Sequence, residues 1–139
     1  MSGGEVHELR VALTVEDYDG ALAFYREALG MPQLEAWEAP EGRVAILDAG
    51  RATLELLDSG QAALVDEIEV GRRVAGTVRL ALEVDDSEVV AERLVRAGAE
   101  QLGDAVVTPW RDRNVRLRAP DGMQLTLFTV PDEAAGPSA

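Results

Sequence analysis

The sequence predicts an α+β fold in which two tandem βαβββ modules form a curved, mostly antiparallel eight-stranded sheet around a cavity, with the helices outside. The main observation is an internal repeat: "RVALTVEDYDGALAFYREALG" at residues 10–30 has a near twin, "RLALEVDDSEVVAERLVRAG", at residues 79–98. Each copy has the pattern of a strand, a turn and a helix, and extended segments follow each copy. Two copies at a spacing of about 70 residues are too few and too widely spaced for the common solenoid repeats. Because a single module would leave an apolar sheet face uncovered, we expect the two modules to pair.

The composition limits the class of protein and its partners. The chain has 139 residues, of which 47% are hydrophobic, and this predicts one compact domain with a packed core. It has no cysteine, no apolar run that approaches the roughly 20 residues of a membrane span, and no signal-like N-terminus, so we expect a cytoplasmic protein without membrane segments. A formal net charge of −13 disfavours nucleic acid as a partner. The richness in alanine, glycine, valine and arginine is typical of a high-GC bacterial source.

The first copy shows each expected element in turn. Val11 and Leu13 alternate with less apolar residues, as in a half-buried strand. Asp17 or Asp19 can then cap a helix, and Gly30 is suited to end that helix in a left-handed conformation. Further strands are expected at residues 34–39, 43–48 and 52–57.

The second copy repeats this order after a less regular segment in which residues 62–68 favour one short helix. A strand is expected at 78–84, a helix at 87–97, and strands near 100–102, 114–119 and 124–128. The predicted organisation is a disordered N-terminus at residues 1–6, module 1 at 7–58, a linker at 59–77, module 2 at 78–130 and a disordered tail at 131–139.

Four segments together carry a family resemblance. They are "RVALTVEDYDGALAFYREALG", "GRATLELLD", "RLALEVDDSEVVAERLVRAGAE" and "TPWRDRNVRLRAPDGMQLTLF". Over roughly residues 10–130 the chain resembles the vicinal oxygen chelate superfamily, which contains glyoxalase I, extradiol dioxygenases and bleomycin resistance proteins. The resemblance implies paired βαβββ modules, a cavity inside the curved sheet and a homodimer.

The resemblance also locates four positions at which the metal-using members carry ligands drawn from His, Gln and Glu. In this sequence those positions hold Arg10, Glu55, Arg79 and Thr126, and only Glu55 is a metal-ligand type. A guanidinium is a permanent cation without a lone pair to donate, so we expect no metal cofactor. His7, the one histidine, lies three residues before Arg10, which turns it toward the opposite face of a regular strand.

Strand alternation extends these four positions to a predicted cavity lining. Residues two apart in a strand share a face, so the cavity face gains Ala12, Thr14, Thr53, Leu57, Ala81, Glu83, Gln124 and Phe128. The opposite face, beneath the helices, is then uniformly aliphatic: Val11, Leu13, Leu54, Leu56, Leu80, Leu82, Leu125 and Leu127.

Several of these side chains have two interpretations. Arg79, helped by Arg10, is expected to receive a carboxylate or another anionic oxygen of a ligand, but Arg10 and Glu55 can equally form a salt bridge that replaces the metal. Trp37 and Trp110 are suited to stack on a planar ligand at the cavity mouth, or to core packing or a dimer seam. The predicted ligand-binding set is Arg10, Glu55, Arg79, Thr126, Trp37, Trp110, Gln124 and Phe128.

The sequence therefore favours a metal-free protein that binds a small organic molecule, planar and anionic, by sequestration as bleomycin resistance proteins do. The alternative is an enzyme of glyoxalase, isomerase or dioxygenase type, which would use a divalent metal or acid–base chemistry through Glu55. A third interpretation is a dimerisation domain whose cavity is vestigial.

Overall fold

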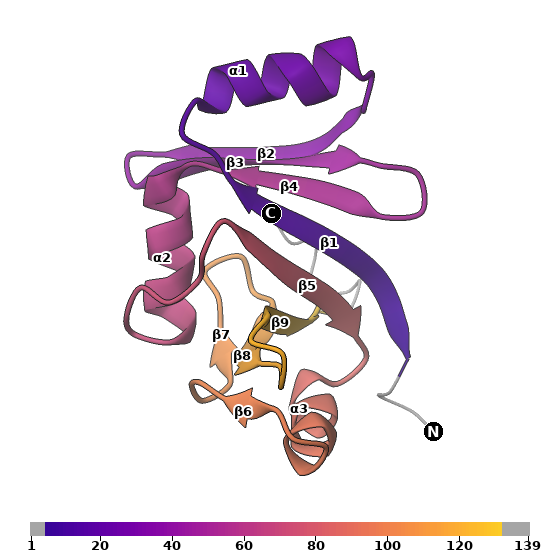
Figure 1. The fold of residues 1–139 in the computed structure, drawn as a ribbon, viewed down its shortest axis with the longest axis vertical. Coiled ribbons are helices and arrows are strands. Elements are labelled where there is room, and N and C mark those ends of the chain that lie inside the picture. Colours follow the sequence, from indigo (N-terminus) through magenta and orange to yellow (C-terminus); the bar gives the residue numbers. More distant parts are fainter. Residues whose placement is uncertain (1–4, 132–139) are drawn as a thin grey trace.

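The structure is a computed structural model that describes residues 5–131, and it has the expected α+β architecture (Figure 1). Residues 1–4 and 132–139, where disorder was predicted, lie outside the described residues. Val6, expected in the disordered N-terminus, is instead the first residue of a strand and pairs with Val84. The strands are β1 Val6–Thr14, β2 Gln33–Ala39, β3 Gly42–Asp48, β4 Thr53–Leu57, β5 Val78–Val84, β6 Glu100–Gln101, β7 Val106–Val107, β8 Arg113–Arg118 and β9 Gln124–Thr129.

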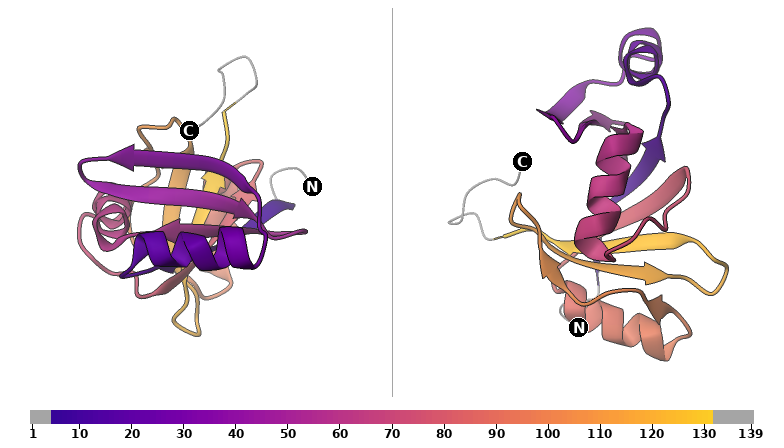
Figure 2. Two further views of the ribbon diagram at one scale, coloured as in Figure 1. Left: turned by 90° about the horizontal axis from the view of Figure 1, so that it is seen from above. Right: turned by 90° about the vertical axis from the view of Figure 1, so that its left-hand side faces the viewer.

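The two modules join along β1 and β5, the central pair of a single open sheet. Its order is β2-β3-β4-β1-β5-β9-β8-β6, and β7 also pairs with β8, which makes nine strands within residues 5–131 rather than eight. The β1–β4 and β5–β9 contacts are parallel and the other pairings are antiparallel. The two halves of the sheet are steeply inclined to each other, so they enclose a concave side (Figure 2).

Two helical segments cover the outer side of the sheet, as predicted. In module 1, α1 Tyr18–Leu22 begins after Asp17, whose side chain accepts a hydrogen bond from Gly20 N, and continues as the π-helix η1 Ala23–Ala28. Gly30 follows with a φ of 78°, the left-handed conformation that glycine adopts without strain. In module 2, α3 Ser87–Arg96 plays the equivalent part.

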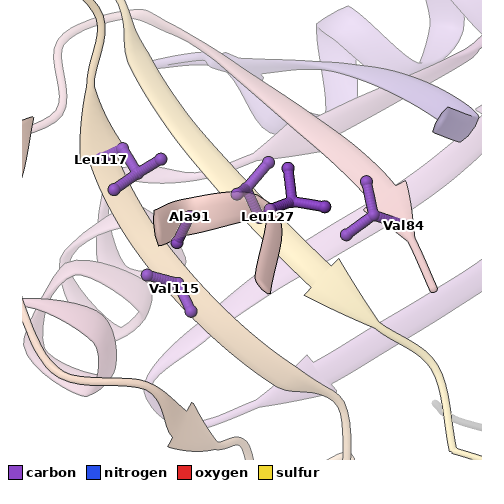
Figure 3. Close-up of a cluster of buried hydrophobic side chains, with 6 residues drawn as sticks. Val84, Ala91, Val115, Leu117 and Leu127 are labelled. Carbon is purple, nitrogen blue, oxygen red and sulfur yellow. The ribbon is translucent and has the colours of Figure 1, made fainter. Parts of the chain in front are cut away.

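The aliphatic residues predicted to lie beneath the helices do so, with the exception of Leu80, which belongs to neither core cluster. Val11, Leu13, Leu54 and Leu56 pack in the cluster under α1. The buried cluster under α3 contains Leu127 together with Val84, Ala91, Val115 and Leu117 (Figure 3). Leu82 and Leu125 pack against it. This agreement confirms the strand register on which the cavity prediction depends.

The third helix departs from the prediction. The linker forms α2 Ser59–Glu69, an eleven-residue helix whose Asp58 cap accepts a hydrogen bond from Gln61 N. It lies on the concave side rather than outside, since its Val65 packs with Ala12 and Leu57 of the inner face. None of the helices in residues 5–131 combines the length and apolar character needed to cross a membrane.

Glycines allow both ends of α2 to approach the sheet and its loops closely. A Cβ added to Gly42 would lie 2.2 Å from Gln61 N, near the start of the helix. One added to Gly103 would lie 2.3 Å from Glu69 O, at its last residue. Such distances are far below van der Waals contact, so any larger residue at either position would displace α2.

Candidate functional site

One row of paired residues crosses five strands of the concave face and defines the centre of the site. Glu35 of β2 pairs with Ile46 of β3, and Ile46 pairs with Glu55 of β4. Glu55 then pairs with Ala12 of β1, which pairs in turn with Arg79 of β5. Directly paired residues project to the same side of a sheet, so the row runs from carboxylate to aliphatic, carboxylate, small and guanidinium side chains.

The first cavity lies over module 1 and has an apolar floor. It is lined by Arg10, Glu35, Ala36, Trp37, Val44, Ile46, Glu55, Gln61, Val65 and Trp110. Its volume is about 50 Å³, below the roughly 300 Å³ typical of pockets that enclose a whole ligand. Trp37, on edge strand β2, is 41% exposed and forms part of the wall next to solvent. The cavity therefore fits one group of a ligand whose remainder extends past Trp37.

A second cavity continues from the first across Arg10, Glu55, Val65 and Trp110, which line both. Its volume is about 40 Å³, and its other lining residues come from α2 and module 2: Glu69, Arg79, Ala81, Asp112, Asn114, Thr126 and Phe128. Of the eight residues predicted to bind a ligand, Gln124 alone lines neither cavity. Its side-chain oxygen instead accepts a hydrogen bond from Arg116 Nη1 at 3.0 Å.

Arg10 does not form the salt bridge with Glu55 that the sequence allowed. Its Nε and Nη2 donate to the carboxylate of Glu8 at 3.0 and 3.3 Å, and its guanidinium lies 4.7 Å from the ring centroid of Phe128. Glu8 is two residues earlier on the same strand, so it shares the face of Arg10, and Thr53 Oγ1 also donates to it. The positive charge of Arg10 is thus already compensated by Glu8.

The charge environment of Arg10 agrees with this pairing. Burial alone would lower the pKa of Arg10, but the hydrogen bond to Glu8 and the charges of Glu55, Glu8 and Glu35 outweigh it, and the pKa is raised. Arg10 therefore stays charged. Glu55 contributes to this effect through its charge, yet within residues 5–131 its carboxylate makes no hydrogen bond or ion pair.

Arg79 is the exception among the buried charges. It is 7% exposed, and its Nη1 donates to Thr126 Oγ1 at 2.9 Å. The ion pairs of the described chain extend to 3.9 Å, and none of them includes Arg79. A cation held away from water is costly unless an anion or several acceptors compensate it. The geometry leaves Arg79 available to a ligand that reaches the second cavity.

A buried network centred on Arg116, which the sequence analysis did not single out, closes the module 2 end of the concave face. Arg116 is fully buried, and it pairs with Asp66 at 2.8 Å and with Glu69 at 2.9 Å, both on α2. Thr126 Oγ1 also donates to Glu69, and Asn114 Nδ2 donates to the same carboxylate. These bonds hold α2 against module 2.

The network could have been found by the alternation already applied to the other strands. In "RNVRLR", Val115 and Leu117 face the outer core, which turns Asn114 and Arg116 inward. Asp66 and Glu69 are three residues apart on α2, and this spacing puts them on one face of a helix. Nothing in the sequence states that the two sets meet, because residues 62–68 were expected to form only one short helix within a linker.

Asp66 receives enough donors to remain ionised although it is fully buried. Burial by itself would raise the pKa of Asp66, but the backbone N–H groups of Ala75 and Val74, with the side chains of Arg73 and Arg116, outweigh it and hold the pKa below its usual range. Two carboxylates, Asp66 and Glu69, thus face two guanidiniums, Arg73 and Arg116.

The remaining predicted residues take these places. Trp110 lies in the β7–β8 loop next to Arg111, whose φ is 78°, and it packs against the cluster of Ala12, Leu57 and Val65. Phe128 is buried beneath Arg10. His7 lies at an irregularity in the β1–β5 pairing, lines neither cavity, and hydrogen bonds to Asp85, which raises the pKa of His7.

The donor set does not fit a divalent metal. The four ligand positions bring one carboxylate, Glu55, together with Thr126 and two guanidiniums, and the cations of Arg10 and Arg79 oppose a further positive charge. Within residues 5–131 no group of three or more His, Cys, Asp or Glu side chains is arranged to hold a metal ion. A metal that binds this protein would need other ligands.

Comparison with known proteins identifies the family. A sequence profile for the glyoxalase/bleomycin resistance protein/dioxygenase superfamily matches residues 9–127. The chain belongs to this superfamily. No curated protein matches the sequence significantly.

Solved structures of several proteins share the fold of this chain. Methylmalonyl-CoA epimerase from Mycobacterium tuberculosis aligns with a TM-score of 0.69 at 20% identity, over 97% of this chain and 95% of that one. A variant of the Streptomyces coelicolor methylmalonyl-CoA epimerase, in complex with 2-nitronate-propionyl-CoA, aligns with a TM-score of 0.61 at 22% identity, over 92% and 98%. A hypothetical protein from Bacillus halodurans aligns at 0.66 and 18% identity, over 92% and 95%.

Proposed function

We propose that this superfamily member binds a small, planar, anionic organic molecule in the concave cavities, by sequestration and without a divalent metal. The observation that carries the proposal is Arg79, a buried guanidinium in the second cavity with no carboxylate partner in the described chain. Trp37 and Trp110 line the adjoining first cavity, where indole rings suit a planar group. Arg10 lines both cavities, but its positive charge is already compensated by Glu8.

Binding can be read directly from the protein's own fluorescence, because both of its tryptophans line the first cavity. Titration with para-toluate, a planar carboxylate, is expected to change the emission saturably. The Arg79→Met variant should bind about 10- to 100-fold more weakly, since a hydrogen bond to a charged group contributes about 1.5–3 kcal/mol. Arg72→Met, which removes an exposed guanidinium outside both cavities, is the matched control. Equal affinity in the Arg79 and Arg72 variants would refute the proposal.

The absence of a metal role is a separate expectation. Untagged protein should contain no stoichiometric metal, and Zn²⁺, Ni²⁺, Mn²⁺ and Fe²⁺ should give no saturable thermal stabilisation, because a ligand that binds the native state must raise its stability. A saturable stabilisation by one of these ions would favour the enzyme alternative, in which Glu55 would be a ligand or an acid–base group.

We also propose that the protein is a cytoplasmic homodimer. Support comes from β2, an edge strand of the sheet that exposes Leu34 by 53% and Trp37 by 41%. Light scattering should give twice the chain mass of 14.9 kDa, and a monomer mass would contradict the proposal.

A further inference from the structure

The charges around the two cavities largely cancel in internal pairs, and those that remain are of both signs. Arg10 is matched by Glu8, and the α2 acids are matched by Arg73 and Arg116. Apart from the buried Asp112 of the second cavity, the charged lining residues outside these pairs are Arg79 on one side and Glu35 and Glu55 on the other. An anion bound at Arg79 would therefore satisfy only part of the site.

The strand register keeps Glu55 and Arg79 apart. Both pair with Ala12, from opposite sides of β1. Neighbouring strands are separated by about 4.8 Å, so the Cα atoms of Glu55 and Arg79 lie about 10 Å apart. Val65 of α2 and Trp110 pack against Ala12, the residue between them. The hydrogen bond to Thr126 draws the Arg79 guanidinium further away, toward β9. The two charges thus lie apart from each other on the lining of the second cavity, which both residues share.

Besides Glu35 and Glu55, the first cavity contains a buried hydrogen-bond acceptor that has no donor. Gln61 is 3% exposed, it lines this cavity, and its side-chain oxygen is buried without a hydrogen-bond partner in the described structure. A buried acceptor left unpaired costs about 1–3 kcal/mol. The carboxylates of Glu35 and Glu55 line the same cavity, so its unpaired polar groups include three acceptors.

We infer that the ligand carries a protonated nitrogen as well as its anionic group, and is therefore a planar zwitterion. The nitrogen occupies the first cavity, where Glu35, Glu55 and Gln61 accept its hydrogen bonds and the indoles of Trp37 and Trp110 provide rings that attract cations. The anionic group occupies the second cavity at Arg79. This inference rests on the proposed function. It also accounts for the net charge of −13, which would attract the cationic end.

Three probes built on one ring separate the two charges. They are para-(aminomethyl)benzoate with both charges, para-toluate with the anion alone, and para-methylbenzylamine with the cation alone. Tryptophan fluorescence titrations should show the zwitterion binding at least about tenfold more tightly than either single-charge probe, since each end adds a charged hydrogen bond. Glu55→Gln, which keeps the shape of the side chain, should reduce the affinity for the zwitterion to that for para-toluate and leave para-toluate itself no weaker. Glu67→Gln, on the exposed face of α2, is the control.

The outcomes distinguish a failure of this inference from a failure of the proposed function. If para-toluate binds as tightly as the zwitterion, or if Glu55→Gln and Glu67→Gln behave alike, the inference fails while binding at Arg79 stands. If none of the three probes binds, the inference and the proposed function fail together.

Discussion

The two halves of the concave face occupy equivalent positions in the two modules, yet their chemistry is opposite. Ile46 pairs with Glu55 as Arg116 pairs with Thr126, so Ile46 and Arg116 are counterparts. By the same register Val44 corresponds to Asn114. Module 1 presents an aliphatic floor to an open cavity, whereas module 2 presents polar groups that hold the carboxylates of α2. The outer faces of both modules remain aliphatic, so the repeat has kept its core and diverged where the cavity lies.

A second difference lies within module 2, between two buried arginines. Arg116 on β8 is enclosed by two carboxylates, while Arg79 on β5 has only a hydroxyl. Thr126 connects them, because its oxygen accepts from both arginines and its hydroxyl donates to Glu69. The first arginine is a structural anchor, and the second is available to a ligand. Substitutions at the two positions should therefore have different consequences.

The largest expected effect is a loss of stability on substitution of Arg116. Arg116→Met leaves Asp66 and Glu69 buried without their shared partner, and removal of one member of a buried ion pair costs about 3–5 kcal/mol. Urea denaturation of the variant should show a loss of this size in the free energy of unfolding. Arg113→Met on the same strand is the control, because Arg113 is exposed and 3.7 Å from Glu88, and it should cost less than about 1 kcal/mol. Equal small losses would mean that the network does not anchor α2.

A smaller loss is expected where α2 meets module 2 through a glycine. The added methyl group of Gly103→Ala would lie 2.3 Å from the carbonyl oxygen of Glu69, so the end of α2 must move. Overpacking of this kind typically costs about 1–3 kcal/mol. In Gly76→Ala the new methyl group meets no atom within 4 Å, and the stability should be almost unchanged. The comparison can be made by thermal and urea unfolding of the two variants side by side.

The buried carboxylate of Asp66 should also make the stability of the protein sensitive to acid. The pKa of Asp66 is lower in the folded chain than in the unfolded chain, so its contribution is complete above its unfolded value of about 3.9 and is lost as the pH falls through the folded value. The free energy of unfolding should therefore decrease below about pH 4. Asp66→Asn should show a shallower decrease than the wild type, and Glu67→Gln should not. An unchanged acid slope in Asp66→Asn would contradict the assigned pKa direction.

The smallest effect on stability is expected at Arg79, despite its burial. Arg79→Met removes a cation that has no internal carboxylate partner and replaces it with an apolar chain of similar length. We expect a change within about 1 kcal/mol of zero, because the lost hydrogen bond to Thr126 is offset by the removed desolvation cost. Urea denaturation beside Arg116→Met provides the test. A loss as large as that of Arg116→Met would show that Arg79 is also a structural anchor.

The internal repeat and the family resemblance were sufficient to predict the fold. The resemblance located Arg10, Glu55, Arg79 and Thr126, and alternation along the strands then added Phe128 to the same face, because a regular strand fixes the side on which each residue projects. It could not choose between Glu8 and Glu55 as the partner of Arg10. Both carboxylates are near the guanidinium, and the choice depends on side-chain conformations that no sequence pattern specifies.

The linker was the main part that sequence patterns could not place. Its inner face carries Asp66 and Glu69, which read as solvent-exposed residues because acidic side chains are seldom fully buried unless they are paired. Their partners, Asn114 and Arg116, lie about fifty residues later in the chain. Only the folded arrangement brings the two sets together, so the contact between the linker helix and module 2 was not predicted.

The most direct test of the difference between the two arginines is an NMR titration that observes their Nε–H groups while para-toluate is added. The 13 cationic side chains of the protein are all arginines, and the Arg79 signal can be assigned by its loss in Arg79→Met. Arg116, fully buried, should be identifiable by slow exchange of its Nε–H with solvent. We predict that the Arg79 signal shifts saturably while the Arg116 signal stays in place. A titration in which Arg116 shifts and Arg79 does not, or in which neither responds, would contradict the assignment of Arg79 as the ligand-binding arginine.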